Sequence, residues 1–267
     1  MNRNSPIGVI DSGVGGLTVL RSLQKEFPHE HFIYIGDTAR TPYGTRSREE
    51  ITAMVKEIVD CLASKDIKQL VVACNTITVL GTETVRNNHM FHVIGMSKGA
   101  KLAQAVTKNK RIGVFATDFT VGTRAHQKAI QAIDPTAQVF SQGCTKFVPL
   151  IEGEKFGSPE LTAAINEYSD ILKQNKVDTV LLSCTHYPFV KAEVEEAFGP
   201  EVTVIDPADA TVSDALEDLE ETNLLCTSGT GHCQVCFTAD VDRAKRLAGR
   251  MLNMENCDFQ EINLQNK

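Results

Sequence analysis

The feature that most constrains the fold is a regular alternation of short apolar runs with longer stretches of helical periodicity. Most of the runs are continuously apolar, a pattern typical of parallel strands that are covered on both faces. The eight runs span residues 6–11, 31–37, 69–74, 91–96, 111–117, 138–143, 179–184 and 202–207. Helical spacing fills the intervals, for example over 48–66 and 159–176. We therefore predict an α/β fold in which right-handed crossovers join parallel strands.

The runs also repeat in type, four in each half of the chain. Ile7-Gly8-Val9 returns as Ile112-Gly113-Val114, and the third run of each half ends in a cysteine, Cys74 or Cys184, followed by polar residues. The matched cysteines favour two similar domains with mostly parallel sheets flanked by helices. We expect the active site in a cleft between these domains.

The expected domain boundaries follow from this repeat. Residues 208–267 carry helical patterns and no further strong strand pattern, so we predict a helical tail that returns to the first domain. The first domain would then comprise residues 1–97 and 208–267, and the second residues 98–207.

The charge and apolar patterning exclude several classes of protein. The formal net charge is −7, which argues against nucleic-acid or membrane-surface binding, because both need basic patches. The N-terminus has no signal-peptide pattern, and no apolar run reaches the ~18 residues of a membrane span. We expect a cytoplasmic protein that binds a small molecule. The eight cysteines are irregularly spaced, which favours reduced thiols.

Ligands of open α/β sheets bind beyond the carboxyl ends of the strands, so polar residues there are the functional candidates. These candidates are Asp11-Ser12-Gly13, Asp37-Thr38, Cys74-Asn75-Thr76, Thr117-Asp118 and Cys184-Thr185-His186. The glycine-rich segment 11–16 fits neither nucleotide-binding glycine motif, so we predict a tight turn that presents Asp11 and Ser12. For Asp37, a helix cap is an equal alternative.

The two cysteines suit proton transfer at carbon. A thiol that ends a strand and begins a helix has a lowered pKa. A thiolate base and a thiol acid on opposite faces of one carbon can invert an amino acid without a cofactor. Asp11, beside the Cys74 strand, and His186, two residues after Cys184, are candidates to set the protonation of these thiols.

At these residues the chain resembles the aspartate/glutamate racemase superfamily, and most closely its glutamate racemases. The matching segments are GVIDSGVGGLTVLRSL (8–23), YIGDTARTPYG (34–44), VVACNT (71–76), KFVPLIEG (146–153) and LLSCTHYP (181–188). The resemblance implies two α/β domains and cofactor-independent interconversion of L- and D-glutamate. It also implies that the D-glutamate serves peptidoglycan synthesis, and hence the cell wall and cell shape.

The resemblance also implies roles for individual residues. Cys74 would take the proton from D-glutamate with help from Asp11, and Cys184 would take it from L-glutamate with help from His186. Glu152 matches a glutamate near the family's active site, with a less defined role. The implied substrate-binding residues are Asp11, Ser12, Tyr43, Gly44, Asn75, Thr76, Thr185 and His186.

Three positions depart from the family pattern without removing a catalytic group. Ser97-Lys98 precede Gly99, where the family usually has a proline, and this puts hinge motion or regulation in doubt. Ser183 replaces the usual glycine before the second cysteine, and Thr41 precedes Pro-Tyr-Gly.

Two alternatives remain open from the sequence. One is a racemase of aspartate or another amino acid. The other is a metal-binding or thiol-redox protein built on Cys233-x-x-Cys236, with Cys226 and His232 nearby. A second ligand pair is missing because Cys257 is the only later candidate, so we expect ordinary thiols and no metal. The oligomeric state stays open, and a homodimer is among the states allowed.

Overall fold

The computed structural model describes residues 1–86 and 89–264, and the chain divides into two compact units. Unit 1 comprises Met1–Met96 and Ala208–Lys267, and unit 2 comprises Ser97–Pro207. Each unit contains a sheet whose strand pairings are all parallel among the described residues.

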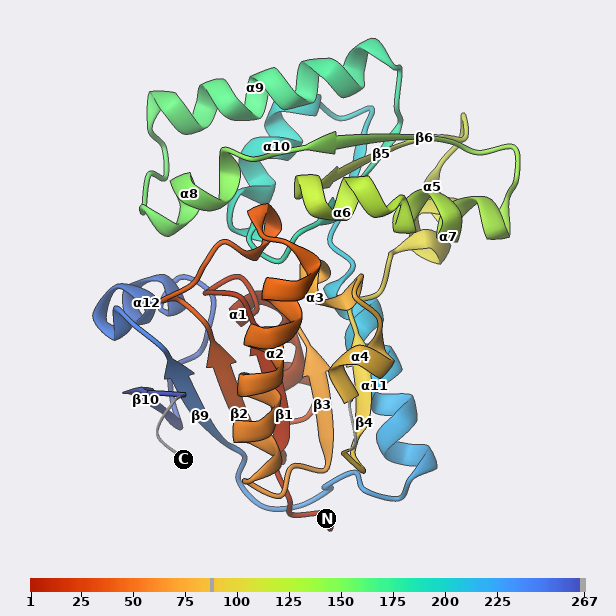
Figure 1. Cartoon of the computed structure of the whole chain (residues 1–267). Helices are drawn as coiled ribbons and strands as arrows, with labels where there is room; N and C mark the ends of the chain where they lie inside the picture. Colours follow the sequence, from red (N-terminus) through yellow and green to blue (C-terminus); the bar gives the residue numbers. More distant parts are fainter. Residues whose placement is uncertain (87–88, 265–267) are drawn as a thin grey trace. The chain divides into compact units, whose positions relative to one another are not determined.

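Unit 1 is built on a six-stranded sheet of order β10-β9-β2-β1-β3-β4. In Figure 1, α2 crosses in front of this sheet, while α1 and α11, which pack against each other, lie behind it. Its elements are β1 (Ile7–Asp11), α1 (Leu17–Glu26), β2 (His31–Gly36), the 3₁₀ helix η1 (Tyr43–Thr45), α2 (Arg48–Ala63), β3 (Gln69–Val72), α3 (Asn75–Thr78), α4 (Thr82–Arg86), β4 (His92–Gly95), α11 (Ala208–Glu221), β9 (His232–Phe237), α12 (Val241–Ala248) and β10 (Cys257–Glu261).

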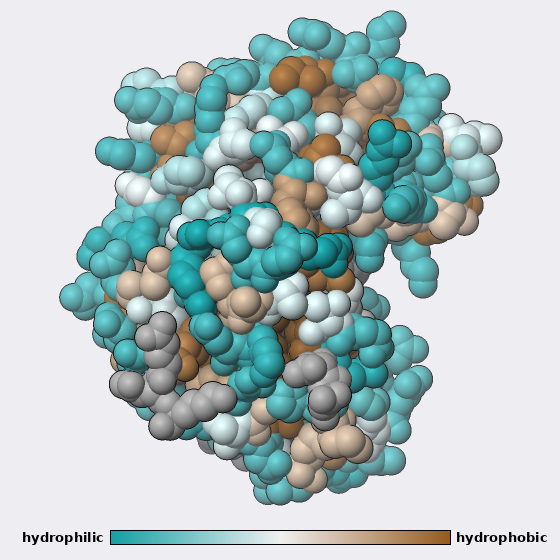
Figure 2. Space-filling view, viewed as in Figure 1, coloured by the Kyte–Doolittle hydropathy of each residue, from teal (hydrophilic) through white to brown (hydrophobic). Residues whose placement is uncertain are grey.

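Local sequence explains why α2 begins and how it packs. The Ser47 side chain accepts a hydrogen bond from the Glu50 backbone, and the Glu50 side chain accepts one from the Ser47 backbone. This capping box satisfies two backbone donors of the first turn. The next apolar residues recur at helical spacing and are buried, whereas the charged residues between them face solvent; the same surface is hydrophilic in Figure 2.

Unit 2 is built on a four-stranded sheet of order β6-β5-β7-β8. Its longest helix, α9, begins after Ser158, whose side chain accepts a hydrogen bond from Leu161, and has Pro159 in its first turn. The elements of this unit are α5 (Ala100–Val106), β5 (Arg111–Ala116), α6 (Asp118–Thr123), α7 (Ala125–Ile133), β6 (Gln138–Gly143), α8 (Phe147–Glu152), α9 (Pro159–Gln174), β7 (Thr179–Ser183), the 3₁₀ helix η2 (Tyr187–Val190), α10 (Lys191–Phe198) and β8 (Thr203–Ile205).

Both faces of the central strands β5 and β7 are buried, as their continuous apolar runs predict. Along β5, Ile112 and Val114 pack in one cluster with residues of α5 and α7. Phe115, between Val114 and Ala116, packs in the other cluster with residues of α8, α9 and α10. Alternate side chains of a strand point to opposite faces, so each strand must be apolar throughout.

The two sheets share a strand order. Unit 1 contains β2-β1-β3-β4 and unit 2 contains β6-β5-β7-β8, so in each unit the first strand lies between the second and the third. All eight predicted strands are present, with ends that differ by up to a few residues. The prediction of two similar α/β units with parallel sheets is confirmed.

The prediction that residues 208–267 form a helical tail is wrong. This segment adds β9 beside β2 and β10 beside β9, in addition to α11 and α12. Polar residues interrupt both strands, and β10 is an edge strand with several exposed side chains. An edge strand has only one pairing partner and needs no continuous apolar run, which is why the sequence pattern concealed it. Among the described residues, no helix has the length and apolarity required to cross a bilayer.

Candidate active site

Cys74 lies at the carboxyl end of β3. The Ala73 N–H donates to the Ile10 carbonyl at 2.8 Å, which extends the pairing with β1 to the residue before the cysteine. Cys74 has extended backbone angles and directly precedes α3. Its side chain is only 4% exposed, and its Sγ donates to Oγ of Ser12 at 3.6 Å. The unit therefore holds this thiol in a fixed, nearly buried position.

The loop after β1 brings Ser12 to this thiol. Oδ2 of Asp11 accepts a hydrogen bond from the Gly13 N–H at 2.9 Å, and the Tyr34 hydroxyl donates to the Gly13 carbonyl at 2.7 Å. A Cβ atom at Gly16 would lie 2.7 Å from Cβ of Asp11, so only glycine lets α1 begin this close to the strand. The predicted turn is present, and it places Asp11 and Ser12 at the carboxyl end of the sheet.

Asn75 supplies a donor beside Cys74. Its side chain is 4% exposed, and within residues 1–86 and 89–264 its Nδ2 has no hydrogen-bond partner. A buried amide donor without an acceptor is costly, so the site favours a ligand with an acceptor oxygen. Thr76, the next residue, is buried as well.

Asp37 lies at the end of β2 at the centre of a polar cluster. It accepts hydrogen bonds from the Tyr43 hydroxyl, from Nε of Arg40 at 2.6 Å and from Oγ1 of Thr238 at 2.8 Å. Burial, followed by the charge and hydrogen bond of Asp37, raises the pKa of Tyr43, which keeps this phenol protonated. The helix-cap alternative for Asp37 is wrong, because the next helical segment begins after Pro42.

In unit 2, Cys184 follows β7 as Cys74 follows β3. Its Sγ lies 4.0 Å from Nδ1 of His186, and Nε2 of His186 lies 2.8 Å from Oε1 of Glu152. The exposed fractions are 7% for Cys184, 2% for His186 and 5% for Glu152. The thiol, the imidazole and the carboxylate thus form a buried line. Thr185, between the cysteine and the histidine, is also buried.

The surroundings of His186 determine which protonation state of its imidazole is favoured. Burial lowers the pKa of His186, but its hydrogen bonds to Cys184 and Glu152 and the charges of these groups raise the pKa well above the ordinary value. These contacts favour the protonated form of His186. A protonated imidazole in this position attracts negative charge on the neighbouring sulfur and carboxyl group.

Sequence reasoning missed Cys144, which follows β6. Burial and then the charge of Cys184 raise its pKa well above the ordinary value, so it stays a neutral thiol beside the site. The Tyr187 hydroxyl donates to the Cys144 carbonyl at 3.3 Å, and burial raises the pKa of this tyrosine too. Its position after a predicted strand was the signal that would have identified Cys144.

The candidate residues therefore fall into two groups. Asp11, Ser12, Cys74, Asn75 and Thr76 come together in unit 1, where Tyr43 and Gly44 form part of η1. Glu152, Cys184, Thr185 and His186 come together in unit 2. In each group a buried thiol at the end of a parallel strand has a polar partner, which equips it to exchange a proton. Within the part of the chain that the structure describes, no group of three His, Cys, Asp or Glu side chains is placed to hold a metal.

Comparisons with known proteins find similar sequences and structures over most or all of the chain. Residues 7–215 match the model of the Asp/Glu/Hydantoin racemase family. A glutamate racemase of Gloeothece citriformis is 40% identical over 251 residues, which is 94% of this chain and 90% of that protein. The solved structure of a glutamate racemase isoform from Bacillus anthracis has a TM-score of 0.92 and 32% identity, with 100% of both chains covered. A glutamate racemase from Francisella tularensis, solved in complex with D-glutamate, has a TM-score of 0.87 and 28% identity, covering 99% of this chain and 100% of that one.

Proposed function

Because the chain belongs to the Asp/Glu/Hydantoin racemase family, we propose that it interconverts L-glutamate and D-glutamate without a cofactor. The support for glutamate is the similarity to glutamate racemases over nearly the full chain, including one that binds D-glutamate. The observation that carries the chemistry is the buried line of Cys184, His186 and Glu152.

The proposed reaction uses one thiol on each face of the α-carbon. From L-glutamate, the Cys184 thiolate removes the α-proton, and the Cys74 thiol donates a proton to the opposite face. From D-glutamate the roles are reversed. Each turnover in one direction leaves a thiol at the base and a thiolate at the acid, and exchange of one proton with solvent restores the starting state. A fixed acid and a fixed base save the entropic cost of bringing them to the carbon.

His186 and Asp11 would set the charge of the two thiols. The protonated His186, held by Glu152, stabilises a thiolate at Cys184. On the Cys74 side, Asp11 ends the strand that pairs with β3, and we assign it the corresponding assisting role. Glu152 acts through His186 and is a positioning residue.

Substrate binding would draw on donors next to both thiols. Nδ2 of Asn75, which has no acceptor in the part of the chain that the structure describes, suits a substrate carboxylate oxygen. We assign the other substrate contacts to the polar groups at the strand ends and to the start of η1. These residues are Asp11, Ser12, Tyr43, Gly44, Thr76, Thr185 and His186.

The biological role that we propose is the supply of D-glutamate for peptidoglycan synthesis in the cytoplasm, and through it cell-wall biogenesis and cell shape.

The oligomeric state that we propose is a homodimer. Sedimentation of the purified chain tests it: a species of twice the chain mass supports the dimer, and a monomer at assay concentration contradicts it.

The deciding experiment offers each enantiomer of glutamate and of aspartate to the purified protein and follows circular dichroism without added cofactor. Aspartate is one methylene shorter, and a missing methylene changes specificity by about 10–200-fold, so we expect glutamate to react roughly 100-fold faster. Comparable or faster turnover of aspartate would move the assignment to an aspartate racemase. No turnover of either amino acid would contradict the proposal.

A further inference from the structure

The Cys233-x-x-Cys236 motif does not form a redox pair within its own strand. Both cysteines lie on β9, three residues apart, so their side chains point to opposite faces of the sheet. Cys236 pairs in register with Gln260 of β10, and its Sγ accepts a hydrogen bond from the Gln260 side chain at 3.2 Å. Cys233 pairs in register with Cys257. The cysteine that lies beside Cys233 in the structure is therefore Cys257, and not Cys236 of the sequence motif.

Cys233 and Cys257 lie in positions that suit a disulfide, because they are register partners on neighbouring strands. Neighbouring strands lie about 4.7–4.9 Å apart, and disulfides join residues whose Cα atoms are about 4.4–6.8 Å apart. Register partners in parallel strands direct their side chains to the same face, and the two thiols interact with each other. Among the described residues, β10 lies at the edge of the sheet and pairs with β9.

The two thiols differ in reactivity. The hydrogen bond from Cys233, followed by one from Nε2 of Gln24 at 3.4 Å and the nearby charge of His232, lowers the pKa of Cys257 to about 6, although burial and Asp258 oppose the shift. The same contact and burial raise the pKa of Cys233, which is only 1% exposed. Cys257 is partly exposed. A partly exposed thiolate beside a buried thiol is the arrangement of an attacking and a resolving cysteine.

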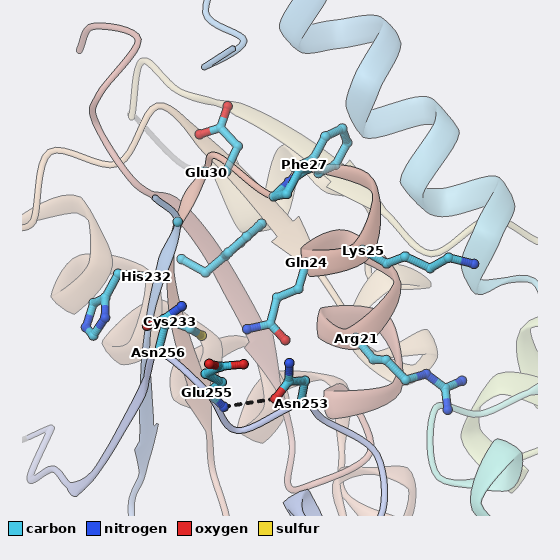
Figure 3. Close-up of a pocket in the computed structure, with 13 residues that line it drawn as sticks. Arg21, Gln24, Lys25, Phe27, Glu30, His232, Cys233, Asn253, Glu255 and Asn256 are labelled. Carbon is cyan, nitrogen blue, oxygen red and sulfur yellow. Dashed lines mark hydrogen bonds between the residues drawn. The ribbon is translucent and has the colours of Figure 1, made fainter. Parts of the chain in front are cut away.

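A surface pocket is bordered by Cys233, the buried member of this pair. The pocket has a volume of about 360 Å³, and Figure 3 shows Gln24 of α1 and Cys233 of β9 on its wall, near Asn253 and Asn256. Cys257 follows Asn256 directly in the chain. The volume admits a small oxidant such as hydrogen peroxide.

We propose that Cys233 and Cys257 form a reversible disulfide across β9 and β10, with a hydroperoxide as the oxidant. The Cys257 thiolate attacks one peroxide oxygen, the O–O bond breaks, and the hydroxide that leaves takes up a proton as water. Sulfur of Cys233 then attacks the Cys257 sulfenic acid, its thiol proton is released, and the S–O bond breaks with loss of a second water. In total, two thiols lose two electrons and two protons, and hydrogen peroxide becomes two molecules of water.

The bond would reinforce the edge of the unit 1 sheet that supports the Asp37 cluster. Thr238 directly follows β9 and donates to Asp37, which in turn accepts from Tyr43. Closing the loop between Cys233 and Cys257 restricts the unfolded chain, so oxidation should raise the thermal midpoint of unit 1. The proton-transferring thiols take no part in this step.

The test treats the reduced full-length protein with hydrogen peroxide, blocks free thiols with an alkylating reagent and maps peptides by mass spectrometry. We expect peptides containing Cys233 and Cys257 to be joined with loss of two hydrogen atoms, and dithiothreitol to separate them. Cys236→Ser, the matched control from the same strand, should keep this cross-link. Cys233→Ser should replace it with a sulfenic acid on Cys257 that a dione reagent traps.

Several outcomes would overturn the proposal. They are a cross-link between Cys233 and Cys236, or over-oxidation of Cys257 without any cross-link in the wild type. Because Cys233 is buried, Cys233→Ala serves as a second variant, with thermal melting as the check on folding. In the reduced wild type we also expect Cys257 to be alkylated about tenfold faster at pH 7 than Cys61, a thiol on α2 that is also partly exposed. Equal rates would contradict the role of Cys257 as the attacking thiol.

Discussion

Nε2 of His186 lies 2.8 Å from Oε1 of Glu152, and both side chains are buried. The other ring nitrogen of His186 faces Sγ of Cys184 at 4.0 Å. One imidazole therefore links a carboxylate on α8 to the thiol that follows β7. Glu152 is therefore, with Cys184, one of the two groups whose contacts raise the pKa of His186.

The first prediction removes this carboxylate charge. Glu152→Gln should lower kcat/KM for glutamate by about 10–100-fold, because a hydrogen bond to a charged group contributes about 1.5–3 kcal/mol. The loss must be equal from L- and D-glutamate, since the two enantiomers are equally stable. The pKa of His186 should fall in the variant, so the alkaline decline of kcat/KM should move to lower pH. The measurement is the pH profile of racemisation.

Glu167→Gln is the matched control, because Glu167 is on the same unit and forms an exposed ion pair with Lys146. This variant should retain wild-type rates and pH dependence. A Glu152→Gln enzyme with a reduced rate but an unmoved pH profile would mean that Glu152 serves packing and does not set the charge of His186.

The second prediction concerns acid stability. His126 on α7 is 3% exposed, and burial, followed by the charge of Lys98, lowers its pKa to about 4. Between pH 6.5 and 4 the unfolded chain binds a proton at this histidine and the folded chain does not. The free energy of unfolding should therefore fall as the pH falls through this window, by up to about 3 kcal/mol in total.

Urea denaturation at pH 7 and pH 5 measures this effect. His126→Gln should flatten the difference between the two pH values, because the substituted side chain does not titrate. His31→Gln alters an exposed histidine and should leave the difference unchanged. An unaltered pH dependence in His126→Gln would show that other groups cause the acid sensitivity.

The strands that could be predicted from the sequence are those whose burial on both faces requires apolar residues throughout. A strand covered on both faces must be apolar throughout, as β5 and β7 are, so the pattern identified it. β10 was concealed because an edge strand tolerates exposed polar side chains such as Asp258 and Gln260. β9 was concealed because polar residues interrupt its buried ones, and its pairing with β2 is set by tertiary contacts far apart in sequence.

The site residues that could be predicted from the sequence are those whose position follows from the strand order of the sheets. Cys74 and Cys184 follow equivalent strands, and ligands of parallel sheets bind at that end. Glu152 reached the candidate set only through resemblance, because its contact with His186 joins residues on separate elements. The bond of the Tyr43 hydroxyl to Asp37 depends on side-chain conformation, which no spacing pattern encodes.

The third prediction concerns cofactors. Two thiols suffice for proton transfer, and no lysine has a recognisable pyridoxal-phosphate setting in the sequence. We expect the purified protein to lack pyridoxal absorbance and to remain active in excess chelator. Activity that is lost after exhaustive metal removal and restored by added metal would contradict this expectation.

The fourth prediction concerns the two thiols. Cys74→Ser and Cys184→Ser should each nearly abolish racemisation, because inversion needs a base on one face and an acid on the other. A serine hydroxyl is a far weaker acid than a thiol and makes a poor base. Cys61→Ser, which alters a thiol on α2, should retain activity. If either active-site variant kept near-normal racemisation, Asp11 or His186 would have to be the base on that side.

The last prediction distinguishes two bases from one by the fate of solvent hydrogen. In deuterated water, the early product from either enantiomer should carry deuterium at the α-carbon, while recovered substrate gains little. This asymmetry arises because Cys74 and Cys184 each serve one face, and a proton taken by one thiol returns to the same face only by reversal. Mass spectrometry of the separated enantiomers measures both pools. If the substrate pool exchanged as fast as product formed, one base shared by both faces would be favoured, and the two-thiol assignment would be wrong.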